Sequence, residues 1–183
     1  MGAYSPAPLL TDEYLDRIKK EIIEPTINEL NKRNIDYRGV IYFGLMITKS
    51  GPKVIEYNCR FGDPECQTIM PLMDQNFVFL LEKCAMGNLT GDEKIHTSDK
   101  VSGCVIATSK GYPHEYKTGF PIKIGNIDPY DCQIFDSGTS LNENGELLTD
   151  GGRVLSIVCQ EEDFDKVFEK AYRNLKEINF EGI

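Results

Sequence analysis

The segment Val54–Glu65 holds the residues whose types and spacing are best suited to chemistry. It begins like a strand and ends like a charged loop, and Glu56, Asn58 and Arg60 occupy alternate positions in it. Alternate side chains on a strand share one face, so this face would offer a carboxylate, a carbonyl oxygen and a fixed cation close together. Such oxygen ligands suit Mg²⁺ or Mn²⁺, and a planar guanidinium suits phosphate. The pattern predicts a metal–phosphate site, with a solvated strand face as the alternative.

Length, composition and charge limit the classes of protein to which the chain can belong. Its 183 residues are 40% hydrophobic and 27% charged, which leaves room for one large domain or two small ones. A formal net charge of −9 argues against a nucleic-acid surface. The sequence has no basic run, no apolar stretch that could cross a bilayer and no signal-like N-terminus. These features predict a cytoplasmic protein that binds neither nucleic acid nor membrane.

The cysteines give no sign of a disulfide framework or a metal site. They are scattered along the chain without a CxxC pair, so we expect six reduced thiols, as is usual in a cytosolic protein. A zinc site is not expected, because His96 and His114 also lack ligand spacing. The cysteines are Cys59, Cys66, Cys84, Cys104, Cys132 and Cys159.

The first half of the chain predicts a broken helix followed by a β-hairpin. Apolar residues at helical spacing span about Asp12–Asn34, with Thr11 as the N-cap and Pro25 as the break. β-branched and aromatic residues then indicate strands at Tyr37–Thr48 and Lys53–Asn58 around a turn. The first of these strands is almost wholly apolar, which indicates burial on both faces.

The remaining segments alternate between helices and short strands. The first residues, Met1–Pro8, form a turn-rich leader whose prolines favour extended backbone. Helices are expected at Cys66–Leu72, at Asn76–Met86 and over an amphipathic stretch from Phe164 to Ile178. The expected strands are Val101–Thr108, Cys132–Phe135, Thr139–Leu141, Leu147–Thr149 and Arg153–Cys159.

Several of these segments together resemble the C-terminal half of the phosphoribosylamine–glycine ligase family, which is a branch of the ATP-grasp superfamily. The run Glu56–Glu65 is close to a signature of that family, and the resemblance extends from the first residue to the last. The matching segments are Met1–Pro8, Gly39–Thr48, Gly51–Gln67, Ser109–Pro113, Gly151–Leu155 and Phe180–Gly182.

The resemblance implies a reaction and the residues that perform it. The family activates glycine with ATP as glycyl phosphate, and the amine of 5-phosphoribosylamine then displaces phosphate, giving glycinamide ribonucleotide, ADP and phosphate. Glu56 and Asn58 match the family's divalent-metal ligands, and Arg60 matches the catalytic arginine beside the transferred phosphate. Asp63 lies in the loop that faces the substrates, where it would bind the glycine ammonium or orient the amine. Its structural alternative is to cap the helix that follows.

The leader and the hairpin also acquire roles from the resemblance. The leader matches a family loop near the substrates, whose backbone N–H groups would hold a phosphate; the residues concerned are Gly2, Tyr4, Ser5 and Pro6. Leu45 and Ile55 match apolar positions that pack against adenine. The structural alternatives are that Tyr4 packs against its neighbours and that Leu45 and Ile55 are plain core.

Lys110 and Arg153 lie in segments that match the family, whereas one acid that many ATP-grasp enzymes carry is missing here. The family places the Lys110 turn near the active cleft, but a surface turn residue is the simpler interpretation. Arg153, after two glycines, is interpreted as structural. Many ATP-grasp enzymes carry a second acidic metal ligand on the first hairpin strand, and Tyr42–Met46 contains no acid. A second ion would therefore depend on ATP oxygens and water.

The implied fold class is α+β. We expect residues 1–92 to form the C-terminal lobe of an ATP-grasp domain, an antiparallel sheet with helices, and residues 93–183 to form a small α+β C-terminal domain. Family members are more than twice this length, and their N-terminal substrate domain and ATP-clamping lobe precede the position of Met1. The chain alone is expected to be inactive, because catalysis needs its groups held together. The missing N-terminal half and, as in many eukaryotes, fused purine-pathway domains are the expected protein partners.

Two other functions stay open at this point. The parent protein could be a different ATP-grasp ligase or a carboxylase, against which the run Arg60–Glu65 weighs. The chain could also be a non-catalytic binding module, against which the intact Glu56 and Asn58 weigh. Under the first interpretation the small-molecule partners are glycine, 5-phosphoribosylamine and ATP as co-substrate, with Mg²⁺ or Mn²⁺ as the cofactor.

Overall fold

The chain folds into two compact units that interleave along the sequence. The computed structural model describes residues 1–73 and 77–183, so the predicted helix start at Asn76 lies outside the described residues. Unit 1 comprises Met1–Pro6, Asp63–Leu72 and Thr97–Ile183, and unit 2 comprises Ala7–Gly62 and Met73–His96. The predicted domains, 1–92 and 93–183, were defined by the domain architecture of the family and not by the compact units of the structure. They stay a prediction.

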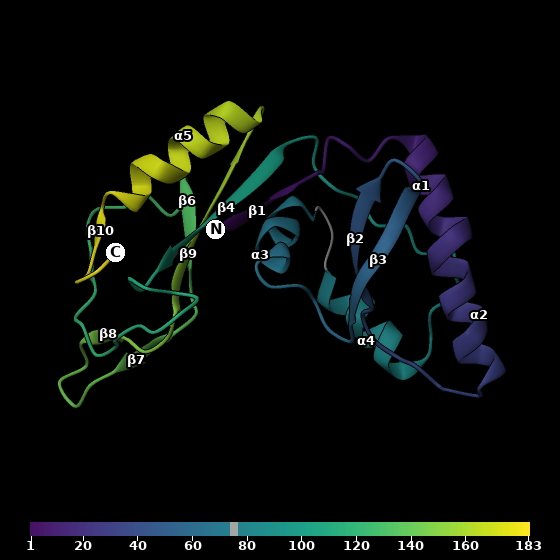
Figure 1. Cartoon of the computed structure of the whole chain (residues 1–183), viewed down its shortest axis with the longest axis horizontal. Helices are drawn as coiled ribbons and strands as arrows, with labels where there is room; N and C mark the ends of the chain where they lie inside the picture. The colour runs from purple at the N-terminus through teal and green to yellow at the C-terminus, as the bar shows by residue number, and fades with distance from the viewer. Residues whose placement is uncertain (74–76) are drawn as a thin grey trace. The chain divides into compact units, whose positions relative to one another are not determined.

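Unit 1 is built on a four-stranded antiparallel sheet in the order β1–β4–β9–β6 (Figure 1). The strands are Gly2–Ser5 (β1), Val101–Thr108 (β4), Cys132–Asp136 (β6) and Arg153–Glu161 (β9). Six successive residues are buried in β4 and six in β9. Both faces of these strands are covered, so their buried residues follow one another without alternation; most are apolar, and Ser102 and Ser156 are the buried polar ones. The predicted strands β4, β6 and β9 are confirmed.

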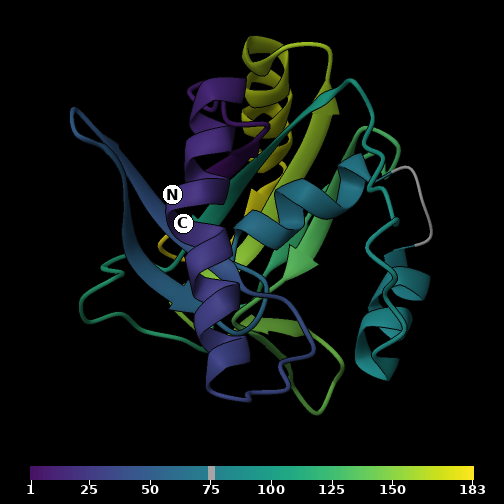
Figure 2. The ribbon, with the colours of Figure 1, turned by 90° about the vertical axis from the view of Figure 1, so that its right-hand side faces the viewer.

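Helix α5 (Phe164–Leu175) covers one face of this sheet (Figure 2). Asp163 is its N-cap and accepts a hydrogen bond from the Lys166 N–H at 2.8 Å. Val167 is fully buried against the sheet, and Gly103 of β4 permits this approach, because a Cβ at that position would collide with Val167. The predicted amphipathic helix is confirmed, although its expected last residue, Ile178, belongs to a short strand instead.

Smaller elements complete unit 1. Strand β7 (Thr139–Leu141) pairs with β8 (Leu147–Thr149) as predicted, whereas the pair β5 (Lys123–Ile124) and β10 (Ile178–Asn179) was not predicted. Helix α3 (Glu65–Ile69) continues into the 3₁₀ turn η2 (Met70–Leu72), close to the predicted helix. Within residues 1–73 and 77–183, no helix is long and apolar enough to span a membrane.

Unit 2 begins with a helix that is interrupted as predicted. Helices α1 (Asp12–Ile18) and α2 (Glu24–Lys32) are joined by a π-helical turn, η1 (Lys19–Ile23), and α1 packs against the hairpin (Figure 2). Thr11 is the N-cap, since its hydroxyl accepts a backbone N–H of the first turn. Pro25 stands in the first turn of α2 and cannot donate a backbone hydrogen bond to the preceding turn, which accounts for the wider winding at η1.

The hairpin of unit 2 consists of β2 (Tyr42–Thr48) and β3 (Gly51–Asn58) (Figure 1). The prediction that its first strand is buried on both faces is wrong, because Gly44 is the one buried residue of β2. The sheet has two strands, so it leaves much apolar surface open. A register shift after Gly44 marks a β-bulge, which leaves Ile55 without a paired residue in β2. Helix α4 (Phe77–Met86) also belongs to unit 2.

The prediction of six reduced thiols is wrong for one pair of cysteines. Cys132 of β6 and Cys159 of β9 lie opposite each other, with their Cα atoms 4.5 Å apart, and form a disulfide. Their sequence separation of 27 conceals this contact, because only the strand register brings the two cysteines together. The other four cysteines are free.

The prediction of a turn-rich leader is wrong for Gly2–Ser5, which form a regular strand at one edge of the unit 1 sheet, whereas a bend and a turn do follow at Pro6 and Pro8. Gly2 lies opposite Val105, and a side chain at Gly2 would collide with the carbonyl oxygen of Cys104. The strand pairs with a segment about a hundred residues later. The local sequence cannot reveal a strand partner that lies so far along the chain. The prediction for the leader therefore rested on its prolines.

Candidate metal and phosphate site

The acid and the amide of the predicted triad lie together on β3. The Asn58 Nδ2 group donates a hydrogen bond to Glu56 Oε1 at 3.0 Å, so the alternation of the strand does place both side chains on one face. Gly44 lies opposite Glu56, and a Cβ there would be 2.7 Å from the Glu56 Cγ atom. Glycine at that position therefore leaves room for the carboxylate to lie over β2.

The donor set of this pair is compatible with part of a Mg²⁺ or Mn²⁺ site. It supplies a carboxylate and an amide carbonyl, which are the oxygen ligands these ions prefer. In the part of the chain that the structure describes, no three or more His, Cys, Asp or Glu side chains gather as a metal site. Further ligands would have to be water or phosphate oxygens, which is how Mg²⁺ is commonly held.

Arg60 lies just beyond the end of β3 and is exposed to solvent. Its Nη1 atom donates to the carbonyl oxygen of Phe61 at 2.6 Å, and the Phe61 ring packs against Phe77 with centroids 5.9 Å apart. Among the described residues Arg60 forms no ion pair, so its charge is not neutralised by Glu56. The guanidinium is held near the end of the strand and remains available to an anion.

Asp63 belongs to unit 1 and is held by two side chains. Gln67 donates its Nε2 hydrogen to Asp63 Oδ1 at 3.0 Å. Arg153 donates from Nη1 to the Asp63 carbonyl oxygen at 2.8 Å, and the same Nη1 lies 3.6 Å from Oδ1. The alternative that Asp63 caps the following helix is wrong, because Pro64 occupies the N-cap of α3 and no side chain caps that end.

Arg153 contributes more to this region than the sequence indicated. Its Nε atom donates to the Tyr112 hydroxyl at 3.1 Å, so one guanidinium joins the Asp63 loop to the turn that carries Tyr112. The bond to Tyr112, helped by the charge of Asp63, raises the pKa of Arg153. The Tyr112 ring lies over Gly152, where any side chain would collide with it. The two glycines before Arg153 were the available sequence signal for this close packing.

The predicted leader residues are engaged in the unit 1 sheet. Gly2, Tyr4 and Ser5 pair with β4, and Pro6 follows a cis peptide bond. The Tyr4 ring packs edge-on against Phe164, with centroids 5.3 Å apart, so the packing alternative is confirmed for its ring. Gly2–Ser5 form an edge strand rather than a loop, and the role of their backbone N–H groups in holding a phosphate stays a prediction. Whether these residues touch a substrate stays a prediction.

The two apolar positions expected beside adenine lie on adjacent strands but are not paired. Leu45 pairs with Val54 across the hairpin, and Ile55 lies at the bulge with 63% of its surface exposed. Ile55 is therefore not plain core. An exposed isoleucine on the hairpin that carries Glu56 is consistent with a ligand wall, and that assignment stays a prediction.

Comparison with known proteins shows the class of protein to which the chain belongs. Residues 1–66 match the family model described as the phosphoribosylglycinamide synthetase ATP-grasp (A) domain, and residues 102–183 match the C domain of the same synthetase. A biotin carboxylase from Campylobacter jejuni shares the fold, with a TM-score of 0.62 and 20% identity over 100% of this chain and 40% of that chain. The fold is that of an ATP-grasp protein.

The relatives narrow the class to one family. A phosphoribosylamine–glycine ligase from Caldanaerobacter subterraneus is 43% identical over 183 residues, and the human trifunctional purine biosynthetic protein adenosine-3 is 37% identical over 187 residues. The crystal structure of the Thermotoga maritima ligase matches with a TM-score of 0.85 and 30% identity, covering 100% of this chain and 44% of that chain. The chain belongs to the phosphoribosylglycinamide synthetase family. It spans 43% of the bacterial relative and 18% of the human one.

Proposed function

We propose that this chain is the C-terminal part of an ATP-dependent ligase that joins glycine to 5-phosphoribosylamine. The observation that supports this most directly is the pairing of Glu56 with Asn58 at the end of the hairpin, with Arg60, which forms no ion pair among the described residues, two residues further on. An acid and an amide suit a divalent ion, and a free guanidinium suits a phosphoryl group. The family match makes glycine and phosphoribosylamine the substrates to test.

The proposed chemistry assigns each group one task. ATP passes its γ-phosphate to the glycine carboxylate, and the amine of phosphoribosylamine then attacks the glycyl phosphate. Glu56 and Asn58 would hold Mg²⁺ or Mn²⁺, which would offset the repulsion between the two anions. Arg60 would pair with the phosphoryl oxygens as charge develops on them. Asp63, held by Gln67 and Arg153, would bind an ammonium or orient the attacking amine.

The proposal extends to partners and to the compartment. Relatives include single ligases and trifunctional proteins, so either arrangement is compatible with the family. The curated ligases are more than twice as long as this chain, and the remainder of such a ligase is the proposed partner for ATP binding. We place the reaction in the cytoplasm, which makes the oxidation state of Cys132 and Cys159 a useful check.

The test is ADP formation with glycine, freshly prepared phosphoribosylamine and Mg²⁺–ATP. The chain is assayed alone and with the N-terminal half of a family ligase added in trans. We expect glycine-dependent turnover only in the mixture. Turnover by the chain alone would show that the missing lobes are dispensable, and turnover with bicarbonate in place of glycine would show a carboxylase instead.

Matched variants connect the assay to the site. Glu56→Gln keeps the size of the side chain and removes its charge, so we expect at least a hundredfold loss of turnover in the mixture. Glu82→Gln makes the same change at an exposed position of α4 and should have no effect. Equal activity of both variants would contradict the assignment of Glu56.

A further inference from the structure

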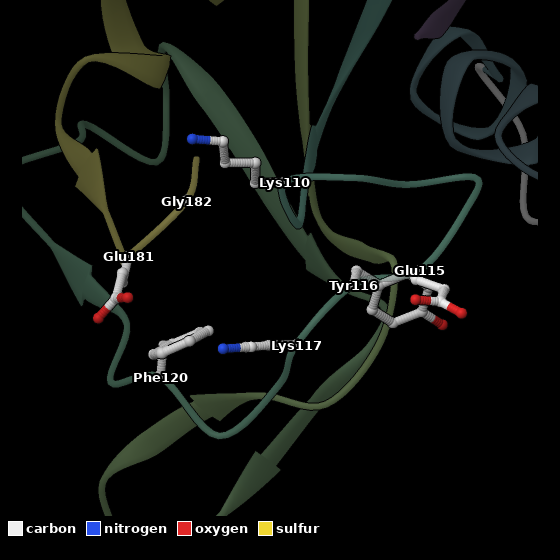
Figure 3. Close-up of a pocket in the computed structure, with 7 residues that line it drawn as sticks. All are labelled: Lys110, Glu115, Tyr116, Lys117, Phe120, Glu181 and Gly182. Carbon is white, nitrogen blue, oxygen red and sulfur yellow. The ribbon is translucent and has the colours of Figure 1, made fainter.

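Unit 1 contains a pocket whose lining residues have no task in the proposed ligase chemistry. It has a volume of about 490 Å³ and is lined by the loop after β4 and by the C-terminal residues (Figure 3). That size is within the range of small-ligand sites. The lining residues are Lys110, Glu115, Tyr116, Lys117, Phe120, Glu181 and Gly182.

The walls of this pocket are fixed by contacts within unit 1. Phe120 is anchored to Thr149: its N–H donates to Oγ1 at 3.1 Å, and its carbonyl oxygen accepts the Thr149 N–H at 2.9 Å. Tyr116 packs against the ring of Tyr112, with centroids 6.1 Å apart. Gly182 lies so close to the stem of Lys110 that a Cβ there would be 3.0 Å from the Lys110 Cβ. The aromatic surfaces are therefore set before any ligand arrives.

Within the described part of the chain, none of the four charged side chains that line the pocket forms an ion pair. These side chains are Lys110, Lys117, Glu115 and Glu181. Figure 3 shows the Lys117 side chain extending toward the Phe120 ring. A pocket that holds both an ammonium without an ion-pair partner and aromatic rings suits a ligand that is both planar and anionic.

We propose that this pocket binds a nucleoside monophosphate. The base would stack on Phe120 or Tyr116, and the phosphate would pair with Lys117. The two carboxylates limit the negative charge that the pocket tolerates, which disfavours a triphosphate, and they can accept hydrogen bonds from ribose hydroxyls or an amino group.

The test is calorimetric titration of the full chain with AMP in EDTA, so that metal-dependent binding elsewhere does not contribute. We expect saturable binding that weakens as salt rises, because the contact to phosphate is partly exposed. Lys117→Gln should weaken it on the order of tenfold, the low end for a charged hydrogen bond. Phe120→Ala should weaken it as well, with thermal unfolding checked to confirm that the variant is folded.

Controls separate this pocket from the hairpin site. Lys94→Gln removes one exposed positive charge from unit 2, and Glu56→Gln alters the metal pair; neither should change AMP binding. Adenosine should bind more weakly than AMP because it lacks the phosphate. Binding that is lost in Glu56→Gln but kept in Lys117→Gln would overturn the proposal. Equal binding of inorganic phosphate and AMP, or no saturation by AMP, would overturn it too.

Discussion

Unit 1 and unit 2 bury apolar side chains to very different extents. In unit 1 the strands β4 and β9 and helix α5 enclose a continuous core, in which Leu155, Ile157 and Val167 are completely buried. In unit 2, among the described residues, Ile18 and Ile22 are the buried hydrophobic residues. Its hairpin and α4 instead expose apolar side chains, such as Ile55 and Phe79. Exposed patches of this kind commonly mark binding or association surfaces.

The difference shows where stability and proposed chemistry are placed. The core that can hold a fold together lies in unit 1, whereas Glu56, Asn58 and Arg60 project from the sparsely covered hairpin of unit 2. Under the proposed function, ATP and the rest of the ligase would cover that hairpin. The two units should therefore respond differently to the same kind of perturbation.

The largest difference is expected from truncating one apolar residue in each unit. Leu155→Ala creates a cavity in the buried core and should lower the free energy of unfolding of unit 1 by about 2–5 kcal/mol. Ile55→Ala removes an exposed side chain and should change stability by about 0.5 kcal/mol or less. Urea unfolding followed by hydrogen exchange of each unit measures both. Similar losses from the two variants would remove the contrast between the units.

The disulfide offers the next test. Replacing Cys132 and Cys159 together by alanine opens a loop closed over a separation of 27 residues, so unit 1 should lose about 3 kcal/mol in the chain-entropy view, while unit 2 is unchanged. Urea unfolding of the double variant measures the loss. Alkylation of the denatured, unreduced protein checks the bond itself: four labelled thiols are expected, and six would restore the reduced state that the sequence suggested.

A smaller effect is expected at Arg153. Arg153→Lys cannot bond the Asp63 carbonyl and the Tyr112 hydroxyl with one planar group, so unit 1 should lose about 1 kcal/mol. Thermal unfolding gives the loss, and the NMR signal of the Gln67 side-chain amide should shift as the Asp63 loop moves. Tyr112→Phe removes one of the two bonds and should have a smaller effect. A lysine variant with unchanged stability and spectrum would show that the guanidinium does not organise the loop.

The smallest expected effect concerns an ion pair of unit 2. The bond from Lys83, together with backbone N–H groups of Thr90 and Gly91, lowers the pKa of Glu93 to about 2. Because the folded pKa lies below the unfolded value near 4.3, this contribution is present above about pH 4 and is lost as the pH falls toward 2. An NMR titration of the Glu93 carboxyl should show the low midpoint. A midpoint near 4.3, or a loop whose acid response is unchanged in Glu93→Gln, would contradict this.

Local sequence predicted the elements whose signals lie within a few residues. The alternation of Glu56 and Asn58 was sufficient to place them on one face, and Thr11 and Pro25 marked the start and the interruption of the first helix. The α+β class with antiparallel sheets was also predicted correctly, because β-branched runs and the amphipathic helix at Phe164–Leu175 are strong patterns.

The features that could not be predicted depend on partners far along the chain. Strand β1 exists because β4 accepts it, and Cys132 reaches Cys159 through strand register. The contact between Arg153 and Asp63 joins residues ninety positions apart. Burial of the first hairpin strand was predicted wrongly for a related reason. An apolar composition shows that a strand can be buried, but the packing of the rest of the fold decides whether its faces are covered.

The central position of β9 in the sheet has a consequence for folding during synthesis on the ribosome. Strand β4 is apolar on both sides, and its inner neighbour β9 is synthesised about 45 residues after it. At ~5–20 residues per second, that leaves β4 uncovered for a few seconds in every round of translation. During this interval β4 of the nascent chain is exposed and is paired on one edge at most. Binding of chaperones to the nascent chain should therefore be strongest just before Arg153–Glu161 leaves the exit tunnel.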